Sequence, residues 1–191
     1  MGNVNSFYQA KQELEQEMKR EVTDKEIMKK MGDQGFFACL APEKFGGLEM
    51  PEGNLAATLM AMEVARVSPS WGLPFNLQMN GPQNVLLKFG TEAQKEQFLP
   101  GLISGAVGGC FAITEPNSGS DVASMKTTAT EVEDGYILNG TKTWISGVPY
   151  CGCGVVYAMP DKAAKHKGMS AFFIDFNTPG VVQRAITTKL G

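Results

Sequence analysis

The chain has 191 residues, of which 43% are hydrophobic and 19% are charged, and its formal net charge is −3. This composition is typical of a globular protein that buries a core, and the charge balance gives no basic surface for nucleic acid or an anionic membrane. No apolar segment approaches the roughly 18 residues that span a bilayer, and the N-terminus lacks an apolar signal core. The expected compartment is therefore the cytoplasm.

The cysteines predict neither a disulfide framework nor a metal site. Cys39, Cys110, Cys151 and Cys153 are too few and too scattered to staple a chain of this length. Only one residue separates the last two, and the single histidine, His166, has no partners of the kind that zinc requires.

Helical signals dominate residues 1–107. Residues 11–31 are rich in Glu, Lys, Gln and Met and are followed by Gly32, which predicts a helix that stops there. Asn54 is expected to cap the next helix, which carries a broad apolar face.

Two further helices are predicted before the pattern changes. One spans residues 82–89 and ends at a glycine. Thr91 and Gln94 have the spacing of a capping box for the other, which we expect Pro100 to interrupt.

From residue 108 onward the hydrophobic period changes to two. The segments with this pattern are "TTATEV", "YILNG", "TKTWIS", "GVVYAM", "MSAFFIDF" and "VVQRAI". Asp134-Gly135 and Asn139-Gly140 are dipeptides that favour hairpin turns. We therefore predict an α+β protein, in which an all-helical domain (1–107) precedes an antiparallel β-barrel-like domain (108–191).

The loop "TEPNSGSD", residues 114–121, is unusually rich in small polar residues. Gly119 permits a backbone with positive φ, and successive N–H groups there can form a concavity for an anion. Ser118 and Ser120 add hydroxyl donors suited to phosphate oxygens. The alternative is an ordinary surface turn without a ligand, which composition alone favours. No P-loop or dinucleotide fingerprint accompanies the loop.

Trp144 is the second candidate. It lies in "GTKTWISG", in a segment expected to be an alternating strand, close to Lys142 and Ser146. A tryptophan in a strand usually packs into a core. The functional alternative is an aromatic wall against a flat cofactor, with Ser146 donating a hydrogen bond to the cofactor edge.

The segments "CFAITEPNSGSDVASMKTTA" and "YILNGTKTWIS" together resemble the paired signature of the acyl-CoA dehydrogenase family. The resemblance extends through "MKKMGDQGFFACLAPEKFGG", "MEVARVSPS", "KFGTEAQKEQFLPGLISGAVGGCFAITEP" and "KGMSAFFIDFNTPGV". It covers nearly all of the chain from about Asp24, and the order and spacing of the segments make it specific.

The resemblance implies that FAD lies against the β domain. Phe111, Ile113 and Thr114 would border the flavin, and Gly119 and Ser120 would meet its pyrophosphate, with Ser120 also near the coenzyme A arm.

Three further roles follow from the same resemblance. Trp144 would stack on the flavin, and Ser146 would donate to the N5 region of its ring. Gln78 matches a position that lines the acyl pocket, with ordinary helix packing as an equal alternative.

The implied activity is α,β-dehydrogenation of an acyl-CoA thioester, with electrons passed to an electron-transferring flavoprotein. The family also implies a homotetramer or homodimer, in the cytoplasm or, in a processed eukaryotic protein, in the mitochondrial matrix. The catalytic base of the family, a Glu on a C-terminal helical bundle, would lie beyond Gly191, and Glu115 matches a structural position instead. We therefore expect the 191 residues to be part of a longer protein; the alternative is a non-catalytic flavin- or CoA-binding fragment.

The motifs are nearest to the glutaryl-CoA branch, but the arginine that holds the distal carboxylate in that branch would fall near Gly72. We therefore favour a short, branched, alicyclic or aromatic acyl group over glutaryl. Two other hypotheses remain: enoyl-CoA reduction or oxygenation on the same fold, and a flavin-free scaffold. Because the positions implied to contact flavin are present, the scaffold is disfavoured.

Overall fold

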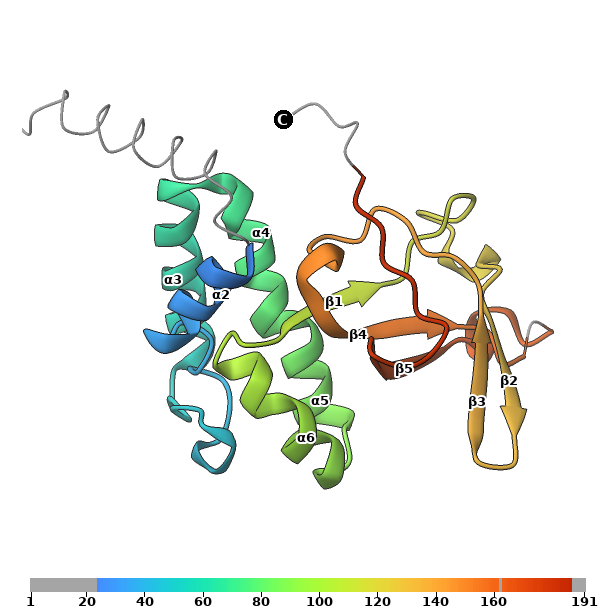
Figure 1. Ribbon diagram of the computed structural model, residues 1–191, viewed down its shortest axis with the longest axis horizontal. Coiled ribbons are helices and arrows are strands. Elements are labelled where there is room, and N and C mark those ends of the chain that lie inside the picture. Colours follow the sequence, from blue (N-terminus) through green and yellow to red (C-terminus); the bar gives the residue numbers. More distant parts are fainter. Residues whose placement is uncertain (1–23, 162, 187–191) are drawn as a thin grey trace, which may run out of the picture.

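The computed structural model describes residues 24–161 and 163–186, and it has a helical lobe followed along the chain by a sheet lobe (Figure 1). This order confirms the predicted α+β class. Most of the helix expected over residues 11–31 lies outside the described residues. The helices are α2 (Asp24–Asp33), α3 (Gly53–Val67), α4 (Pro69–Gln78), α5 (Asn84–Phe89) and α6 (Glu92–Ile103).

The start of α6 is set by local chemistry, as predicted. Thr91 Oγ1 accepts a hydrogen bond from Gln94 N at 3.2 Å, and Gln94 Oε1 accepts one from Thr91 N at 2.9 Å. These two bonds form a capping box, which satisfies two of the N–H groups that a helix start leaves unpaired.

Three predictions about the helices were wrong. Asn54 does not cap α3, because the helix already begins at Gly53 and its N-cap residue is Glu52. Pro100 does not interrupt α6, since packing of the buried Leu99 and Leu102 on both sides of it holds the helix together. The helix expected over 82–89 is α-helical only from Asn84, because a five-residue π-turn with a non-helical glycine precedes it.

That π-turn, Met79–Gln83, links α4 to α5 and packs against the first strand of the sheet. Pro82 within it has no N–H to donate, and Gly81 has φ −86° and ψ −106°, outside helical geometry. Regular α-helical hydrogen bonding therefore pauses here before α5 resumes.

The strands are β1 (Gly108–Ala112), β2 (Thr128–Val132), β3 (Gly135–Asn139), β4 (Cys151–Ala158) and β5 (Ser170–Asp175). β1, β4 and β5 form one sheet in that order, and β2 pairs with β3 in a separate antiparallel hairpin. β4 is the central strand, and its nearly continuous burial fits a strand covered on both faces.

The predicted antiparallel barrel needs correction in two respects. β1 and β4 run parallel, and the described strands form two sheets with no closed barrel. Parallel neighbours need a long connection, and here it contains the whole β2–β3 hairpin. A two-residue hydrophobic period is the same in parallel and antiparallel strands, so the sequence pattern could not predict the parallel pairing of β1 and β4.

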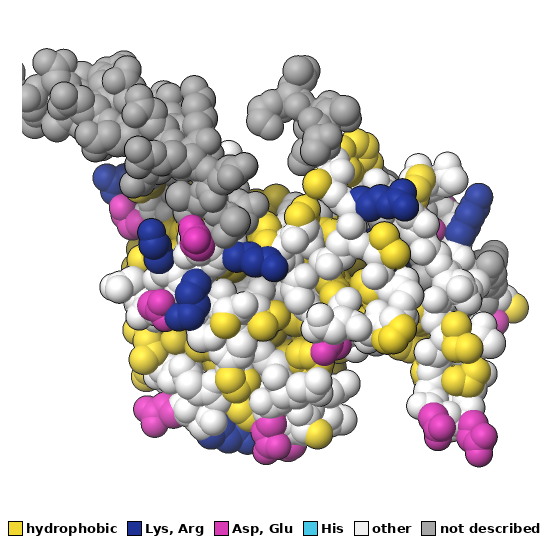
Figure 2. All heavy atoms as spheres, viewed as in Figure 1, with side chains coloured by type: hydrophobic (Ala, Val, Ile, Leu, Met, Phe, Trp, Pro, Cys, Tyr) yellow, Lys and Arg dark blue, Asp and Glu magenta, His cyan; other side chains and the backbone are white. Residues whose placement is uncertain are grey.

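The hairpin predicted at Asp134-Gly135 is confirmed, but its two turn residues are Glu133 and Asp134, because Val132 and Gly135 pair across them and Gly135, at φ 147°, begins β3. Acidic side chains stand at its free tip (Figure 2). Asn139-Gly140 does not turn a hairpin. Gly140 is needed there for another reason, because a Cβ would lie 2.2 Å from Thr127 Oγ1.

Two predicted strands, over 141–146 and 181–186, are absent from the described structure. The first joins its neighbour through one backbone bond, from Thr143 N to Thr114 O at 2.9 Å. In the second, Gln183 Nε2 donates to Cys151 O at 2.8 Å, so a side chain replaces a strand ladder.

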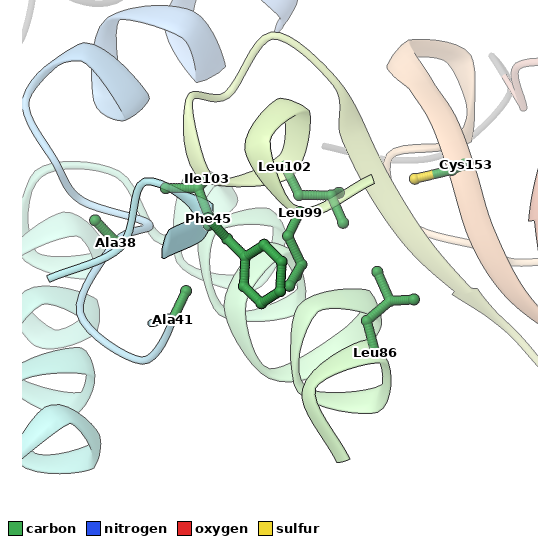
Figure 3. Close-up of a cluster of buried hydrophobic side chains, with 8 residues drawn as sticks. All are labelled: Ala38, Ala41, Phe45, Leu86, Leu99, Leu102, Ile103 and Cys153. Carbon is green, nitrogen blue, oxygen red and sulfur yellow. The ribbon is translucent and has the colours of Figure 1, made fainter. Parts of the chain in front are cut away.

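Helices and sheet share one apolar core. Phe45, Leu86, Leu99 and Leu102 from the helical lobe form one buried cluster with Cys153 on β4 (Figure 3). The four cysteines are buried and form no disulfide bonds. Burial, with nearby Cys110 and Asp175, raises the pKa of the Cys153 thiol to about 12, so this thiol stays protonated and packs as an apolar group.

β1 passes the helices at close range. A Cβ on Gly109 would lie 2.8 Å from both Leu102 Cδ2 and Pro82 Cγ. We predict that Gly109→Ala lowers the free energy of unfolding by about 1–3 kcal/mol, measured by urea denaturation, because the added methyl overpacks this junction. Gly119→Ala is the matched control and should change it by less than about 0.5 kcal/mol, since a Cβ at Gly119 meets nothing within 4 Å. Equal losses in the two variants would contradict the prediction.

Candidate functional site

The loop 114–121 leaves the end of β1 and is folded tightly on itself. The backbone groups of Glu115 and Ser118 bond to each other in both directions, at 2.9 and 3.2 Å. Ser118 is buried, and its Oγ donates to Asp121 O at 2.7 Å. The hydroxyl of Ser118, one of the two candidate phosphate donors, is therefore engaged within the loop.

The other candidate donor, Ser120, is exposed together with Gly119. The φ of Gly119 is not positive, which corrects the reason given for a glycine at this position. The open side of its backbone, where a Cβ would meet no atom within 4 Å, distinguishes it instead. Only a residue without a side chain leaves that approach to the backbone clear.

The buried carboxylate of Glu115 anchors the loop to neighbouring segments. Glu115 accepts hydrogen bonds from Lys126 N (2.6 Å), from both N (2.9 Å) and Oγ1 of Thr127, and from Lys142 Nζ (2.8 Å). Burial alone raises its pKa, but hydrogen bonds from Lys142, Thr127 and the backbone outweigh burial and lower the pKa from 4.5 to about 2. Glu115 is therefore ionised and structural, as its position implied.

Lys142 connects the anchor to a second segment. Its Nζ also donates to Ile113 O at 3.1 Å, and next to it Thr143 N bonds to Thr114 O. Residues 113–115 and 142–143 are thus held side by side. The structure brings the predicted residues Ile113 and Thr114 beside the segment that carries Trp144 and Ser146.

Trp144 is not a core residue. Its side chain is 64% exposed, and its backbone has φ 59°, in the left-handed region that an aromatic residue rarely occupies. Both features cost free energy, and strain of this kind is concentrated at functional sites. Ser146 lies two residues after Trp144 and is half-buried.

Phe111 is the second-to-last residue of β1, shortly before the chain enters loop 114–121. It is half-buried, and its ring meets Tyr157 of β4 with centroids 5.1 Å apart and planes at 55°. Phe111, Ile113 and Thr114 therefore follow one another along the chain into the anchored loop.

Gln78 lies apart from this loop, at the end of α4. It is 1% exposed, and its side-chain amide bonds to three backbone groups, those of Leu102, Val107 and Gly109. Its assignment to an acyl pocket stays a prediction.

Gly72 lines a groove of about 620 Å³ between α3 and α4. The lining consists of small, apolar and amide or hydroxyl side chains, with no charged group. Among the described residues, no cluster of His, Cys, Asp and Glu could hold a metal ion, and no described helix could span a bilayer.

Sequence reasoning missed the contribution of Lys142 and Thr127. A signal was available, because Glu115 lies in an otherwise uncharged run after an apolar strand, and a buried carboxylate requires a cation and donors. The sequence did not show which of the lysines would supply the charge.

We predict that Lys142→Met lowers the free energy of unfolding by about 3–5 kcal/mol, because it leaves the Glu115 carboxylate buried without its cation. Lys126→Met is the control, since it makes the same change of charge on an exposed side chain whose backbone N–H still reaches Glu115. Urea denaturation at pH 7 measures both. A loss of the same size in the two variants would mean that net charge, not the ion pair, is responsible.

The same carboxylate predicts an acid dependence. Because the pKa of Glu115 is lowered on folding, its contribution to stability is complete above about pH 4.5 and is lost as the pH falls toward 2. The difference in unfolding free energy between the unaltered protein and Glu115→Gln should therefore shrink over that range. A difference that does not change with pH would contradict the assignment.

Comparison with known proteins agrees with this arrangement. Residues 3–106 match the family model for the acyl-CoA dehydrogenase N-terminal domain, and residues 110–191 match the model for the middle domain. The order of these two domains agrees with the helical lobe and the β domain of the structure. The chain belongs to the acyl-CoA dehydrogenase family.

Individual relatives differ in their substrates. The chain is 41% identical over 157 residues to glutaryl-CoA dehydrogenase of Desulfococcus multivorans (82% of this chain, 40% of the relative), and 41% identical over 168 residues to mitochondrial isovaleryl-CoA dehydrogenase of Oryza sativa subsp. japonica (88% and 41%). A solved glutaryl-CoA dehydrogenase with glutaryl-CoA has TM-score 0.78 at 41% identity, covering 81% of this chain and 40% of that one. Butyryl-CoA dehydrogenase of Megasphaera elsdenii has TM-score 0.78 at 35%, covering 83% and 42%. The chain thus spans about 40% of the length of these relatives.

Proposed function

We propose that the protein to which this chain belongs is an FAD-dependent acyl-CoA dehydrogenase. It would remove hydrogen from the α and β carbons of an acyl-CoA thioester and pass the electrons to an electron-transferring flavoprotein. The observation that carries the proposal is the junction of the two signature segments. The Glu115–Lys142 pair holds loop 114–121 against the segment of Trp144, and both present exposed groups there.

The groups at this junction fit a flavin dinucleotide. A flat ring needs an apolar surface, and Trp144 offers an exposed one. A pyrophosphate needs donors with no side chain in the way, and the open backbone at Gly119 beside the exposed Ser120 hydroxyl supplies that condition. Ser146 would donate to the ring edge, with Phe111, Ile113 and Thr114 along its border.

Within this scheme the residues of the chain bind and orient. When bound, FAD supplies the redox chemistry that protein side chains lack. The backbone N–H groups of loop 114–121 and the Ser120 hydroxyl would hold the phosphates, and Trp144 would shield one face from water. Glu115 does not serve as the base, since four hydrogen bonds commit its two oxygens and hold it ionised within the fold.

We propose an uncharged acyl group as the substrate. By the family resemblance, the arginine of the glutaryl-CoA branch would fall near Gly72, and the groove that Gly72 lines contains no charged side chain. A distal carboxylate would find no cation there and would lose its hydration. Short and branched acyl groups need no such partner. The relatives named above include an isovaleryl-CoA dehydrogenase and a butyryl-CoA dehydrogenase.

The test is anaerobic titration of the purified full-length protein with isovaleryl-, butyryl- and glutaryl-CoA, followed by flavin absorbance. We expect a yellow protein whose absorbance near the flavin maximum falls with the two uncharged thioesters and not with glutaryl-CoA. Reoxidation of the reduced flavin by an enoyl-CoA, without bleaching by any saturated thioester, would assign the reductase alternative. A colourless protein that FAD cannot reconstitute would overturn the proposal in favour of a scaffold.

The role of Trp144 gives a separate prediction. Trp144→Ala should raise the dissociation constant of FAD roughly 2- to 10-fold, the value of an aromatic stacking contact. Trp144→Phe should retain most of the affinity. Phe89→Ala is the control, because Phe89 is 82% exposed and lies in the helical lobe. Fluorescence titration of the apoprotein measures all three. An unchanged constant in Trp144→Ala would refute the stacking role.

The two loop serines provide a matched pair. Ser120→Ala should weaken binding of FAD or acyl-CoA by about 5- to 10-fold and leave the melting temperature unchanged, because it removes only an exposed donor. Ser118→Ala should instead lower the free energy of unfolding by about 1 kcal/mol, through loss of its bond to Asp121 O. Calorimetry with ligand titration separates the two. The same phenotype in both variants would contradict this division of roles.

A further inference from the structure

Among the described strands, β1 lies at the edge of its sheet, and its free edge faces the helical lobe. In the order β1-β4-β5, β4 occupies one side of β1 and the end of α4 occupies the other. A free strand edge leaves N–H groups that need acceptors. For Gly109 the acceptor is a side chain, since its N–H donates to Gln78 Oε1 at 2.8 Å.

The same amide group is bound on its other side. Gln78 Nε2 donates to Leu102 O, in the last turn of α6, and to Val107 O, just before β1, each at 2.8 Å. A primary amide has two N–H donors, so both are used. With 1% of the residue exposed, Gln78 has no donor left for a ligand.

This connection is rigid because β1 is packed tightly at the same point. Gly109 lies against Leu102 and Pro82 with no room for a methyl group. A displacement of the amide would therefore move the start of β1. Two residues further along, β1 reaches Phe111, and Ile113 and Thr114 follow directly after it.

We propose that Gln78 is a positioning residue that replaces a neighbouring strand on the free edge of β1. Through β1 it would set the place of residues 111–114 at the cofactor, and it would not form a wall of the acyl pocket. The proposal rests on the proposed function, because it assigns residues 111–114 to the flavin border.

The test uses the full-length protein with Gln78→Met, which keeps the length of the side chain and removes all three bonds. Hydrogen exchange at the Gly109 amide, followed by NMR or mass spectrometry, should become at least 10-fold faster. The dissociation constant of FAD should rise about 10-fold, while at saturating FAD the KM for acyl-CoA stays within 2-fold. Gln97→Met, on the exposed side of α6, is the control and should change none of these.

A second variant separates positioning from general loss of stability. Gln78→Glu keeps the acceptor but places a carboxylate against two carbonyl oxygens. Burial favours the protonated form, which regains one donor. Its FAD affinity should therefore recover several-fold as the pH falls from 8 to 6, with no such change in the unaltered protein.

Each outcome decides the matter. Unchanged exchange at Gly109 in Gln78→Met would overturn the proposal, and so would unchanged FAD affinity combined with a raised KM for acyl-CoA, which would assign Gln78 to the pocket wall. If the unaltered full-length protein binds no FAD, the proposed function fails. In that case the exchange rate still shows whether Gln78 holds β1.

Discussion

The buried carboxylate of Glu115 is the constraint on which the site depends. It gathers donors from two segments that are distant in sequence: residues 126–127, just before β2, and Lys142. An ionised carboxylate is stable out of water only when such donors surround it. One side chain thereby fixes where the two signature segments meet.

The helical and sheet lobes depend on each other in a similar way. β1 is short, Gly109 near its start lets it run against α6 and the π-turn, and its free edge is completed by a side chain from α4. The apolar core passes from Leu99 and Leu102 to Cys153 without a break. The two lobes are therefore one packed unit at this junction, and loop 114–121 follows from it.

Two local features were predicted correctly because their causes lie within a few residues, although the cap expected at Asn54 and the turn expected at Asn139-Gly140 were not found. The capping box of Thr91 and Gln94 and the turn at Asp134-Gly135 need only neighbouring groups, and both were confirmed. Features that depend on contacts between distant residues were not predicted correctly. Alternation in "TKTWIS" indicated a strand, yet the segment is held by one backbone bond and by Lys142, and its tryptophan faces outward. Pro100 lies within a helix that core packing sustains.

By itself the sequence determined the order of a helical part and a strand part, and the family, because periodicity and motif spacing are properties of the chain. Only the tertiary structure decided the parallel pairing of β1 with β4, the choice of Lys142 as partner of Glu115, and the commitment of Gln78 to backbone groups. The physical reason is common to all three. Each is a pairing of groups that lie at least 24 residues apart in the chain, and folding alone brings them within hydrogen-bonding distance.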